Sequence, residues 1–600
     1  MNKKNTKPQN IKSIKNFKIF MYIELISSIL FSLFSISFHV DASLISFPIA
    51  LSFTALAVYF AYFLMLKKGD GSRVFGVLKI IQYLPFVLLL AFIVRRVGKQ
   101  PTAFWYDLIS VLLWCIIFVF SMILSYCMND KRIDRLEVNW VIPPKKMKLI
   151  GIEKLIFEIV DWIDAFVQAV FMVLLLQIFI LQLYVIPSES MVPTFLIKDR
   201  VAVSKLNCGP KFPLTDVGLP DLTKYERGDI VVLRNPHYMI DRKSEVKTVT
   251  SQLLYMLTFT KVNLNRDENG ELKADPLVKR IAGIAGEQLV MQDGVLYSRT
   301  KDNDTFTPVK ADEKYACWDL SKINKKLYSR VERYPLSQIE FDSRRSNLGK
   351  VISSASEQYQ VMLDFEEKRR NYDLFVAEFE ARQLVSELKL LVDEEKVSGV
   401  FEQPNMEVYN LFSNVQSITV DILSKKGGID WFEKIMTSWI DNKSSAKDLY
   451  SESNYKLNVM SKICFGNLLV RYAKLLNDNV SSSLWKSDTV LEENMELAST
   501  LVWYIQYLLD SRNMPVFPAN DSNGNPQYIP DNCYFMMGDN RFNSLDLRHS
   551  IDYENALLSK YDSSSVEYLS IMEPKYINKK LIIGKTMFRF WPIDRPMKIQ

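Results

Sequence analysis

Histidine and paired cysteines are scarce in this sequence of 600 residues. Only His39, His237 and His549 occur, and the six cysteines form no C-x-x-C pair. These absences exclude the usual zinc ribbons and fingers, HExxH metalloproteases and thioredoxin-like redox sites. They also leave a serine or cysteine hydrolase with very few histidines to act as its base. We therefore expect no metal and no cofactor.

An excess of charge of one sign is also lacking. The 74 lysines and arginines nearly balance the 68 acidic residues, which leaves a formal net charge of +6. This charge is too small to indicate nucleic-acid binding, and no RNP, zinc-finger or basic-leucine-zipper pattern supports it. We expect no nucleic-acid partner.

Long apolar runs, by contrast, are abundant in the first 186 residues. About 20 residues are needed to span the hydrocarbon core of a bilayer. Five stretches have this length: 19–38, 43–66, 75–94, 103–127 and 163–185. The first is too deep and too long for a secretory signal, so we interpret it as a retained helix. The sequence therefore predicts a multi-span helical membrane region.

The distribution of lysine and arginine predicts the orientation of these spans. Basic residues gather at the N-terminus and in the linker 131–154, and both should be cytoplasmic. The fifth span then delivers everything after about residue 186 to the extracytoplasmic side. Arg95, Arg96 and Lys99 would lie on the outer side, against this rule, which leaves open a re-entrant middle stretch.

The rest of the chain combines two kinds of pattern. Short β-rich stretches bracket a long segment in which apolar residues such as Phe365, Phe375, Phe379 and Leu384 recur at helical spacing, which indicates a packing face. The predicted domains are a membrane region of about four helices with a basic linker (1–160), a final transmembrane helix (161–186), a β domain in two parts (187–297 and 530–600) and an α-helical insertion (298–529).

Three motifs carry the chemistry. Residues 187–194 read Pro-Ser-x-Ser-Met-x-Pro-Thr, residues 277–283 read Leu-Val-Lys-Arg-Ile-Ala-Gly, and residues 538–541 read Gly-Asp-Asn-Arg. In this order, and directly after a membrane span, they closely resemble the bacterial type I signal peptidases, the membrane-anchored serine proteases that remove signal peptides. The resemblance covers about 180–297 and 530–592.

The resemblance implies a role for individual residues. Ser190 would be the nucleophile and Lys279 the general base, and Ser188 with the backbone amide of Ser190 would form the oxyanion hole. Ser544 would hold the lysine in place. Asp546 and Arg548 would brace the loop. The pockets for small side chains at positions −1 and −3 of the cleavage site would be lined by Ile186, Phe195, Leu277 and Val278.

The resemblance also implies the surroundings of the enzyme. The fold would be a multi-span α-helical membrane region followed by a mostly β Ser-Lys protease domain, interrupted by a mainly α-helical insertion. The enzyme would lie in the bacterial cytoplasmic membrane with its catalytic domain on the periplasmic side. Its partners would be signal-peptide-bearing preproteins, membrane lipids and the secretion translocon.

Lysine is also the base that the residues themselves favour. At a reference pKa of about 10.4, only about one lysine in 2,500 is neutral at pH 7. A working base needs a pKa of about 7–8, which corresponds to a shift of roughly 4 kcal/mol. Burial supplies such a shift because it penalises the ammonium form. The apolar neighbours of Lys279 on its predicted strand, Leu277, Val278, Ile281 and Ala282, would provide that burial.

Several alternatives accompany this interpretation. Ser-x-x-Lys occurs at least three times, including 386–389, 444–447 and 453–456, without the K-T-G that accompanies it in penicillin-binding proteins. His549 offers a Ser-His arrangement, as in eukaryotic relatives. A protease with one dedicated substrate, or a non-catalytic receptor or scaffold that uses the insertion, would have the same general architecture. The apolar stretch 249–262 is either an interfacial segment or a buried hairpin or helix.

Overall fold

The computed structural model forms two compact units. One comprises Met1–Leu183, Val203–Thr223 and Tyr238–Asp275, and the other comprises Tyr184–Ala202, Lys224–His237 and Pro276–Gln600. The residues that the structure describes are 11–36, 43–69, 73–129, 151–238, 241–258, 262, 264–265, 273, 275–319, 331, 355–391, 428–593, 595 and 597–598.

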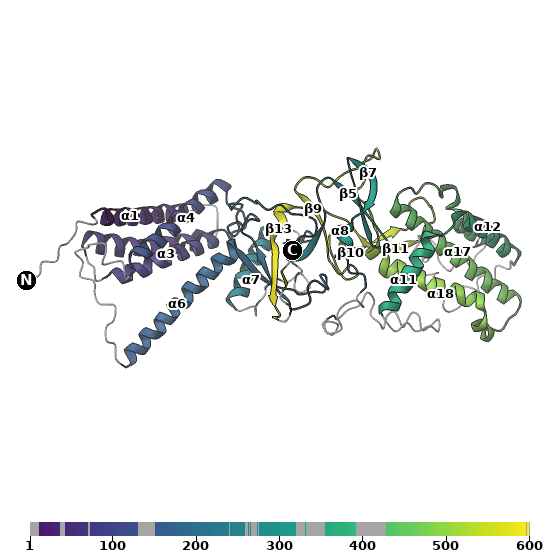
Figure 1. The fold of residues 1–600 in the computed structure, drawn as a ribbon, viewed down its shortest axis with the longest axis horizontal. Helices are drawn as coiled ribbons and strands as arrows, with labels where there is room; N and C mark the ends of the chain where they lie inside the picture. Colours follow the sequence, from purple (N-terminus) through teal and green to yellow (C-terminus); the bar gives the residue numbers. More distant parts are fainter. Residues whose placement is uncertain are drawn as a thin grey trace, which may run out of the picture. The chain divides into compact units, whose positions relative to one another are not determined.

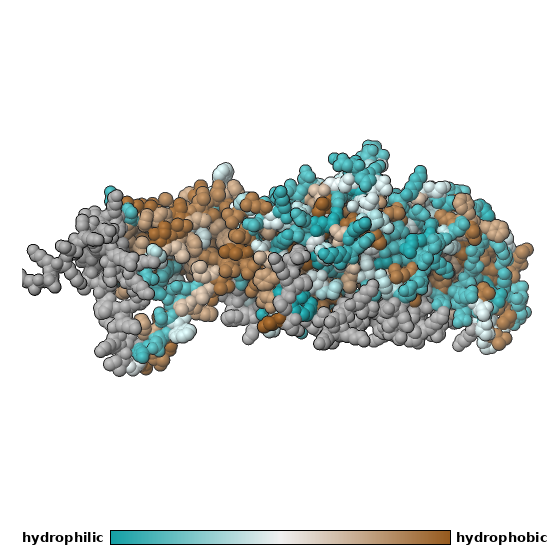
Figure 2. Space-filling view, viewed as in Figure 1, coloured by the Kyte–Doolittle hydropathy of each residue, from teal (hydrophilic) through white to brown (hydrophobic). Residues whose placement is uncertain are grey.

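Apolar helices build the first unit (Figure 1). Their bounds are α1 (Ile11–Phe34), α2 (Ser43–Ala57) with its π-helical continuation η1 (Val58–Lys67), α3 (Val74–Arg95), α4 (Phe104–Cys127) and α6 (Ile152–Phe179). Among the residues that the structure describes, five helical segments are long and apolar enough to cross a membrane, which confirms the multi-span prediction. Helix α1 packs against α4, and α2 packs against α3. Figure 2 shows the apolar surface that these helices present.

The fifth span differs from the predicted range 163–185. Helix α6 begins at Ile152 and ends at Phe179, and strand β1 (Leu181–Val185) follows almost at once. Residues 163–185 form one apolar run, and hydropathy alone cannot locate the point where a helix gives way to a strand. Strand β1 is identified only by its pairing with β2 (Arg200–Ser204).

The arginines that broke the charge rule are paired within the first unit. The Arg96 Nε atom donates to the Asp107 carboxylate at 2.9 Å, and Nη1 donates to the Phe92 carbonyl at 2.8 Å. The Arg242 guanidinium donates to the Arg96 carbonyl. Arg242 begins helix α7 (Arg242–Leu257), so most of the apolar stretch 249–262 that the structure describes is helical. Each middle stretch is a continuous helix long enough to cross a membrane, while the re-entrant alternative stays untested.

An eight-stranded sheet carries the motif residues. Its strand order is β1-β2-β13-β3-β4-β9-β12, and β14 pairs with β13. The remaining strands are β3 (Ile230–Leu233), β4 (Leu277–Gly283), β9 (Cys533–Met537), β12 (Ile577–Asn578), β13 (Ile582–Trp591) and β14 (Met597–Lys598). Antiparallel pairing places Arg280 of β4 opposite Met537 of β9. The sheet thus joins two segments that lie more than 200 residues apart in the sequence.

A second sheet has the strand order β7-β6-β5-β8. Its strands are β5 (Glu287–Gln292), β6 (Val295–Thr300), β7 (Asn303–Pro308) and β8 (Met514–Phe517), and a separate hairpin joins β10 (His549–Leu557) to β11 (Glu567–Met572). Strands β7 and β8 lie inside the range 298–529 that was predicted to be helical. The predicted insertion therefore includes a strand near each of its ends. The domain boundaries themselves stay a prediction.

Helices make up most of what the structure describes between β7 and β8. They are α8 (Lys310–Glu313), α11 (Ala355–Arg370), α12 (Leu374–Leu390), α16 (Gly428–Thr437), η5 (Ile440–Asn442), α17 (Leu449–Asn477), η6 (Ser482–Ser487), α18 (Thr489–Trp503), η7 (Tyr504–Leu508) and α19 (Leu509–Arg512), and the short η8 (Lys579–Leu581) lies near the C-terminus. Asp373, Asp448 and Asp488 cap the N-termini of α12, α17 and α18.

These helices share one hydrophobic core with the β10–β11 hairpin. Leu558, Val566 and Tyr568 of that hairpin segment belong to the same buried cluster as Trp439 of the helical segment. The predicted packing stripe is only partly correct. Leu384 of α12 is buried, but Phe375 and Phe379 are 72% and 73% exposed. Nine residues rotate a helix by about 900°, which places Phe375 and Leu384 on opposite faces.

Candidate active site

Ser190 lies in a tight turn between β1 and β2. The Val192 amide donates to the Glu189 carbonyl at 3.0 Å, which closes the turn. The Ser188 Oγ atom is exposed and donates to Ser190 Oγ at 3.3 Å. On the other side, the Asn540 amide donates to the Ser190 carbonyl at 3.1 Å. The turn thus presents two neighbouring hydroxyls. Its backbone is bonded to the segment 538–540 that follows β9.

Lys279 is buried in the middle of strand β4. It lies opposite Val231 of β3, and only 2% of it is exposed. Its Nζ atom donates to Ser544 Oγ at 3.1 Å. Since a buried ammonium and a buried amine both need a hydrogen-bond partner, Ser544 satisfies this side chain.

Gly538 lies between Ser544, the partner of Lys279, and the backbone of Ser190. A Cβ atom at this position would lie 2.2 Å from Ser544 Oγ and 2.4 Å from the Ser190 carbonyl oxygen. The close approach of these two groups is possible only because position 538 has no side chain. Ser190, Ser544 and Lys279, three residues singled out from the sequence, therefore lie around one glycine.

The surroundings of Lys279 shift its pKa in both directions. The pKa of Lys279 is lowered to about 8: burial is the largest cause, Asp546 and Asp539 oppose it, and the positive charge of Arg548 adds to it. Burial alone would raise the pKa of the Asp546 carboxyl, but Arg548 holds it well below its usual range. Arg548 reaches that carboxylate at 2.9 and 3.0 Å. The lysine can therefore lose its proton near neutral pH.

His549 does not occupy the position of a base. Its Nδ1 atom lies 3.2 Å from the Ser544 carbonyl oxygen, and its Nε2 atom lies 3.1 Å from the Asp510 carbonyl oxygen. Burial and the adjacent Arg548 lower the pKa of this imidazole to about 4, so it is neutral at pH 7. Both ring nitrogens face backbone carbonyls, which argues against the Ser-His alternative.

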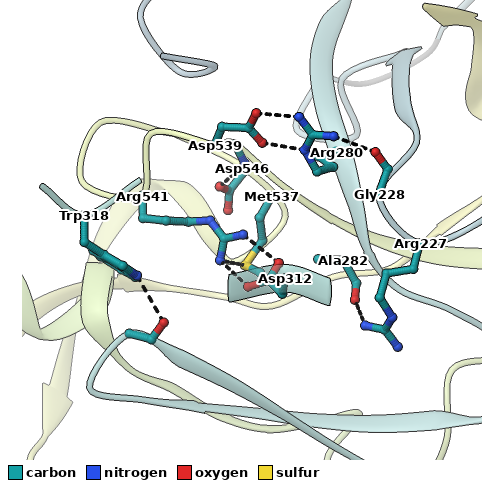
Figure 3. Close-up of polar contacts among 12 residues, drawn as sticks. Arg227, Gly228, Arg280, Ala282, Asp312, Trp318, Met537, Asp539, Arg541 and Asp546 are labelled. Carbon is teal, nitrogen blue, oxygen red and sulfur yellow. Dashed lines mark hydrogen bonds and ion pairs between the residues drawn. The ribbon is translucent and has the colours of Figure 1, made fainter. Parts of the chain in front are cut away.

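A buried ion pair supports the other face of strand β4 (Figure 3). Arg280 Nε and Nη2 donate to the two carboxylate oxygens of Asp539 at 2.8 and 2.7 Å, and Nη1 donates to the Gly228 carbonyl at 2.6 Å. Thr194 also donates to the Asp539 carboxylate. Adjacent residues of a strand point to opposite faces, so Lys279 and Arg280 serve different sides of the sheet.

A second arginine pair ties in the segment after β7. Arg541 donates to the Asp312 carboxylate at 2.9 and 2.6 Å, and all of these groups are buried (Figure 3). Arg280, Asp539 and Arg541 belong to the sequence motifs, but the motifs predict no role for them and do not include Asp312. Arg280 could have been found from the alternation of side chains along β4, because it follows Lys279 and therefore points to the opposite face. Nothing in the sequence pointed to Asp312, which lies inside the predicted insertion.

The four residues expected to line substrate pockets have different environments. Ile186 and Phe195 are buried beside the Ser190 turn. Leu277 and Val278 are half-buried at the start of β4, opposite Leu233 and Val232. Their contact with substrate side chains stays a prediction.

In the described part of the chain, the acidic, histidine and cysteine residues form neither a metal cluster nor a disulfide. Within the described ranges, no group of three His, Cys, Asp or Glu residues could hold a metal ion. All six cysteines are free in the structure. The polar groups around Ser190 and Lys279 suit proton transfer and hydrogen bonding.

The comparison with known proteins agrees with this geometry. The family model described as "Signal peptidase, peptidase S26" matches residues 159–344 and 476–591, which together make up just over half of the chain. The chain belongs to this family. The resemblance inferred from the motifs is therefore confirmed. The segment between the two matches, 345–475, contains α11, α12 and α16 and most of α17.

Individual relatives match over shorter stretches. Signal peptidase I of Pseudomonas aeruginosa is 31% identical over 135 residues, which is 22% of this chain and 46% of the relative. Signal peptidase I of Buchnera aphidicola (subsp. Schizaphis graminum) is 41% identical over 71 residues, 12% of this chain and 23% of the relative. Signal peptidase I P of Bacillus subtilis subsp. natto is 26% identical over 144 residues, which is 24% of this chain and 52% of the relative. The chain thus spans about half or less of each of these relatives. No solved structure matches it.

Proposed function

We propose that this protein is a membrane-bound serine endopeptidase that removes signal peptides from exported preproteins, with Ser190 as nucleophile and Lys279 as general base. The observation that carries the proposal is the buried Lys279 amine, 3.1 Å from Ser544 Oγ and beside the glycine that Ser190 also approaches. A lysine with a lowered pKa next to a serine turn is the arrangement that activates a hydroxyl without histidine.

The proposed reaction assigns a step to each of these groups. Neutral Lys279 accepts the Ser190 proton as Oγ attacks the scissile carbonyl, and the C–O bond forms while the carbonyl electrons move to oxygen. The Ser188 hydroxyl and the Ser190 amide donate to that oxyanion. The lysine then gives its proton to the leaving amine as the C–N bond breaks. Water, deprotonated by the same lysine, hydrolyses the acyl-enzyme. Each oxyanion donor contributes about 3–4 kcal/mol.

Substrate recognition and orientation complete the proposal. Ile186, Phe195, Leu277 and Val278 line the pockets for small residues at −1 and −3. The five apolar helices hold the enzyme in the bacterial cytoplasmic membrane. The catalytic domain faces the periplasm, where preproteins emerge from the translocon beside the membrane lipids.

Two substitutions test the proposal. Full-length protein in detergent is incubated with a preprotein that carries an Ala-x-Ala cleavage site, and the mature product is quantified. Ser190→Ala and Lys279→Met should each lower kcat by at least about 10³-fold, because both act in the same step. Unchanged cleavage in either variant would refute the dyad.

A second lysine provides a matched control. Burial lowers the pKa of Lys205 to about 8 as well, but its amine donates to Gln182 Oε1 at 3.2 Å in the other unit. Lys205→Met should therefore keep its cleavage activity. Cleavage of one substrate out of a panel of preproteins would favour the dedicated-substrate alternative, and cleavage of none would favour the receptor or scaffold.

A further inference from the structure

The loop that carries Ser544, the hydrogen-bond partner of Lys279, also contacts the helical segment. Residues 544–549 carry Ser544 and Asp546, and helix α19 approaches them at the end of the long helical run α18–η7–α19. The last four carbonyl groups of a helix have no partner within that helix. At this helix end the carbonyls face two side chains of the loop.

Two buried side chains bridge the helix end and the loop. Arg548 Nη1 donates to the Ser511 carbonyl at 2.7 Å, while its other nitrogens donate to the Asp546 carboxylate. His549 lies between the Asp510 carbonyl at 3.1 Å and the Ser544 carbonyl at 3.2 Å. Arg548 is 0% exposed and His549 is 3% exposed. The residue that hydrogen-bonds Lys279 is thus one side chain away from α19.

Helix α19 is itself anchored on both sides. The Asp510 carboxylate accepts hydrogen bonds from Ser570 Oγ and the Ile571 amide of β11, both at 2.8 Å. Arg512 donates to the Glu366 carboxylate of α11 at 2.8 and 2.6 Å. These bonds connect α19 to the hairpin and to the helical segment that lies outside the family match. The helix end is therefore a fixed point for the loop.

We propose that α19 positions the Lys279–Ser544 pair, and that His549 is the positioning residue through which it does so. This inference rests on the proposed function. Reaction rates are sensitive to displacements of about 1 Å in catalytic groups. A loop that loses its contact with α19 can move by this amount and can admit water to the lysine. The helical segment then acts as part of the catalytic scaffold.

The charges around the site define the expected pH effect. Asp546, Arg548 and Asp539 face Lys279, and Arg548, Asp546 and Asp510 surround His549. His237 interacts with the backbone of Asp546 from the segment after β3. His549 is neutral at pH 7 and has one N–H, so it donates to one of the two carbonyls and only contacts the other; it acts through these contacts rather than through charge. Water that enters the loop would hydrate the Lys279 ammonium and raise its pKa.

The test compares pH profiles of kcat/KM for full-length protein and His549→Ala. The acid limb should move upward by at least about half a pH unit, with a loss of about 3- to 10-fold at pH 7 that shrinks at pH 9. KM should change by less than about twofold, because the pockets are untouched. An unchanged profile would overturn the inference.

Matched variants separate positioning from general loss of stability. The amide of His549→Asn occupies the position of Nδ1 and keeps only the contact with the Ser544 carbonyl, whereas the amide of His549→Gln occupies the position of Nε2 and keeps only the contact with the Asp510 carbonyl of α19. Each should restore only part of the profile, and complete restoration by His549→Asn would refute the role of α19. Ser438→Ala removes a buried contact with Asp562 elsewhere in the helical core, and it should leave the profile unchanged. An equal shift in Ser438→Ala would refute the specific role of His549.

Hydrogen exchange provides a measurement that does not depend on cleavage. The Gly538 amide is bonded to the Asp546 carboxylate at 2.9 Å, so its exchange reports the closure of this loop. His549→Ala should accelerate exchange across residues 538–549 by about tenfold or more, as expected for a less stable local structure. Unchanged exchange would overturn the inference even if the protein cleaves preproteins. Faster exchange in a protein that cleaves none would instead count against the proposed function.

Discussion

At the scale of single residues, the site depends on one buried lysine and one glycine. Lys279 can act as a base because the sheet removes it from water, and burial is the largest cause of its lowered pKa. Gly538 allows Ser190 and Ser544 to approach each other, since any larger residue would overlap both. Both effects depend on how closely the surrounding residues pack against these two positions.

The pH dependence of cleavage is a direct consequence of this burial. In the proposed mechanism the active form has a neutral Lys279, and protonation below a pKa of about 8 removes the base. We expect kcat/KM to rise about tenfold per pH unit up to pH 8 and then to level off. A profile measured on a preprotein substrate between pH 5.5 and about 9.5 would check this. An acid limb near pH 6.5 would indicate a histidine instead.

At the scale of elements, the helical segment and the β10–β11 hairpin form one core. The pair formed by Lys462 of α17 and Asp562 of the hairpin loop is completely buried, and Ser438 and Asn458 complete its hydrogen bonds. Charged groups this far from water are stable only when they are paired. The pair therefore fixes where α17 meets the hairpin.

Removal of one partner of this pair should destabilise the protein. Lys462→Met leaves the Asp562 carboxylate buried without a cation, so we expect the free energy of unfolding to fall by about 3–5 kcal/mol. Denaturant titration of the full chain in detergent measures this change. Lys389→Met is the matched control, because Lys389 pairs with Glu433 at the surface, and it should cost less than about 1 kcal/mol. Equal losses would contradict the structural role of the buried pair.

The element scale also shows where sequence patterns mislead. The five apolar spans were predictable because hydropathy over about 20 residues is a strong signal. The end of α6 was not predictable, because the apolar run continues into β1. Strands β7 and β8 were missed because each is short and is defined by pairing with a strand distant in sequence.

At the scale of the whole molecule, the arginines that depart from the expected charge distribution have partners inside the first unit. Arg96 pairs with Asp107, and its carbonyl accepts from Arg242, which follows the fifth apolar helix in the chain. The loop after α3 therefore lies at the same end of this unit as the segment around α7. The orientation of the helices in a membrane stays a prediction.

Cysteine labelling of intact cells tests the orientation. A membrane-impermeant maleimide should react with Lys99→Cys and with Asp302→Cys, which lies in the exposed β6–β7 turn. Lys68→Cys, at the opposite end of α3, should react only after the membrane is permeabilised. The parent protein, in which no surface cysteine is added, gives the background. Labelling of Lys68→Cys without permeabilisation would contradict the proposed topology.

The sequence by itself determined the membrane spans, the serine turn, the lysine and the family, because each is written in local patterns of hydropathy or in contiguous motifs. Only the tertiary structure decided what surrounds them. Gly538 brings Ser190 and Ser544 together, Asp312 pairs with Arg541, and α19 meets Arg548 and His549. These contacts join residues far apart in the chain, and burial and pairing over such distances depend on the folded packing rather than on any local pattern.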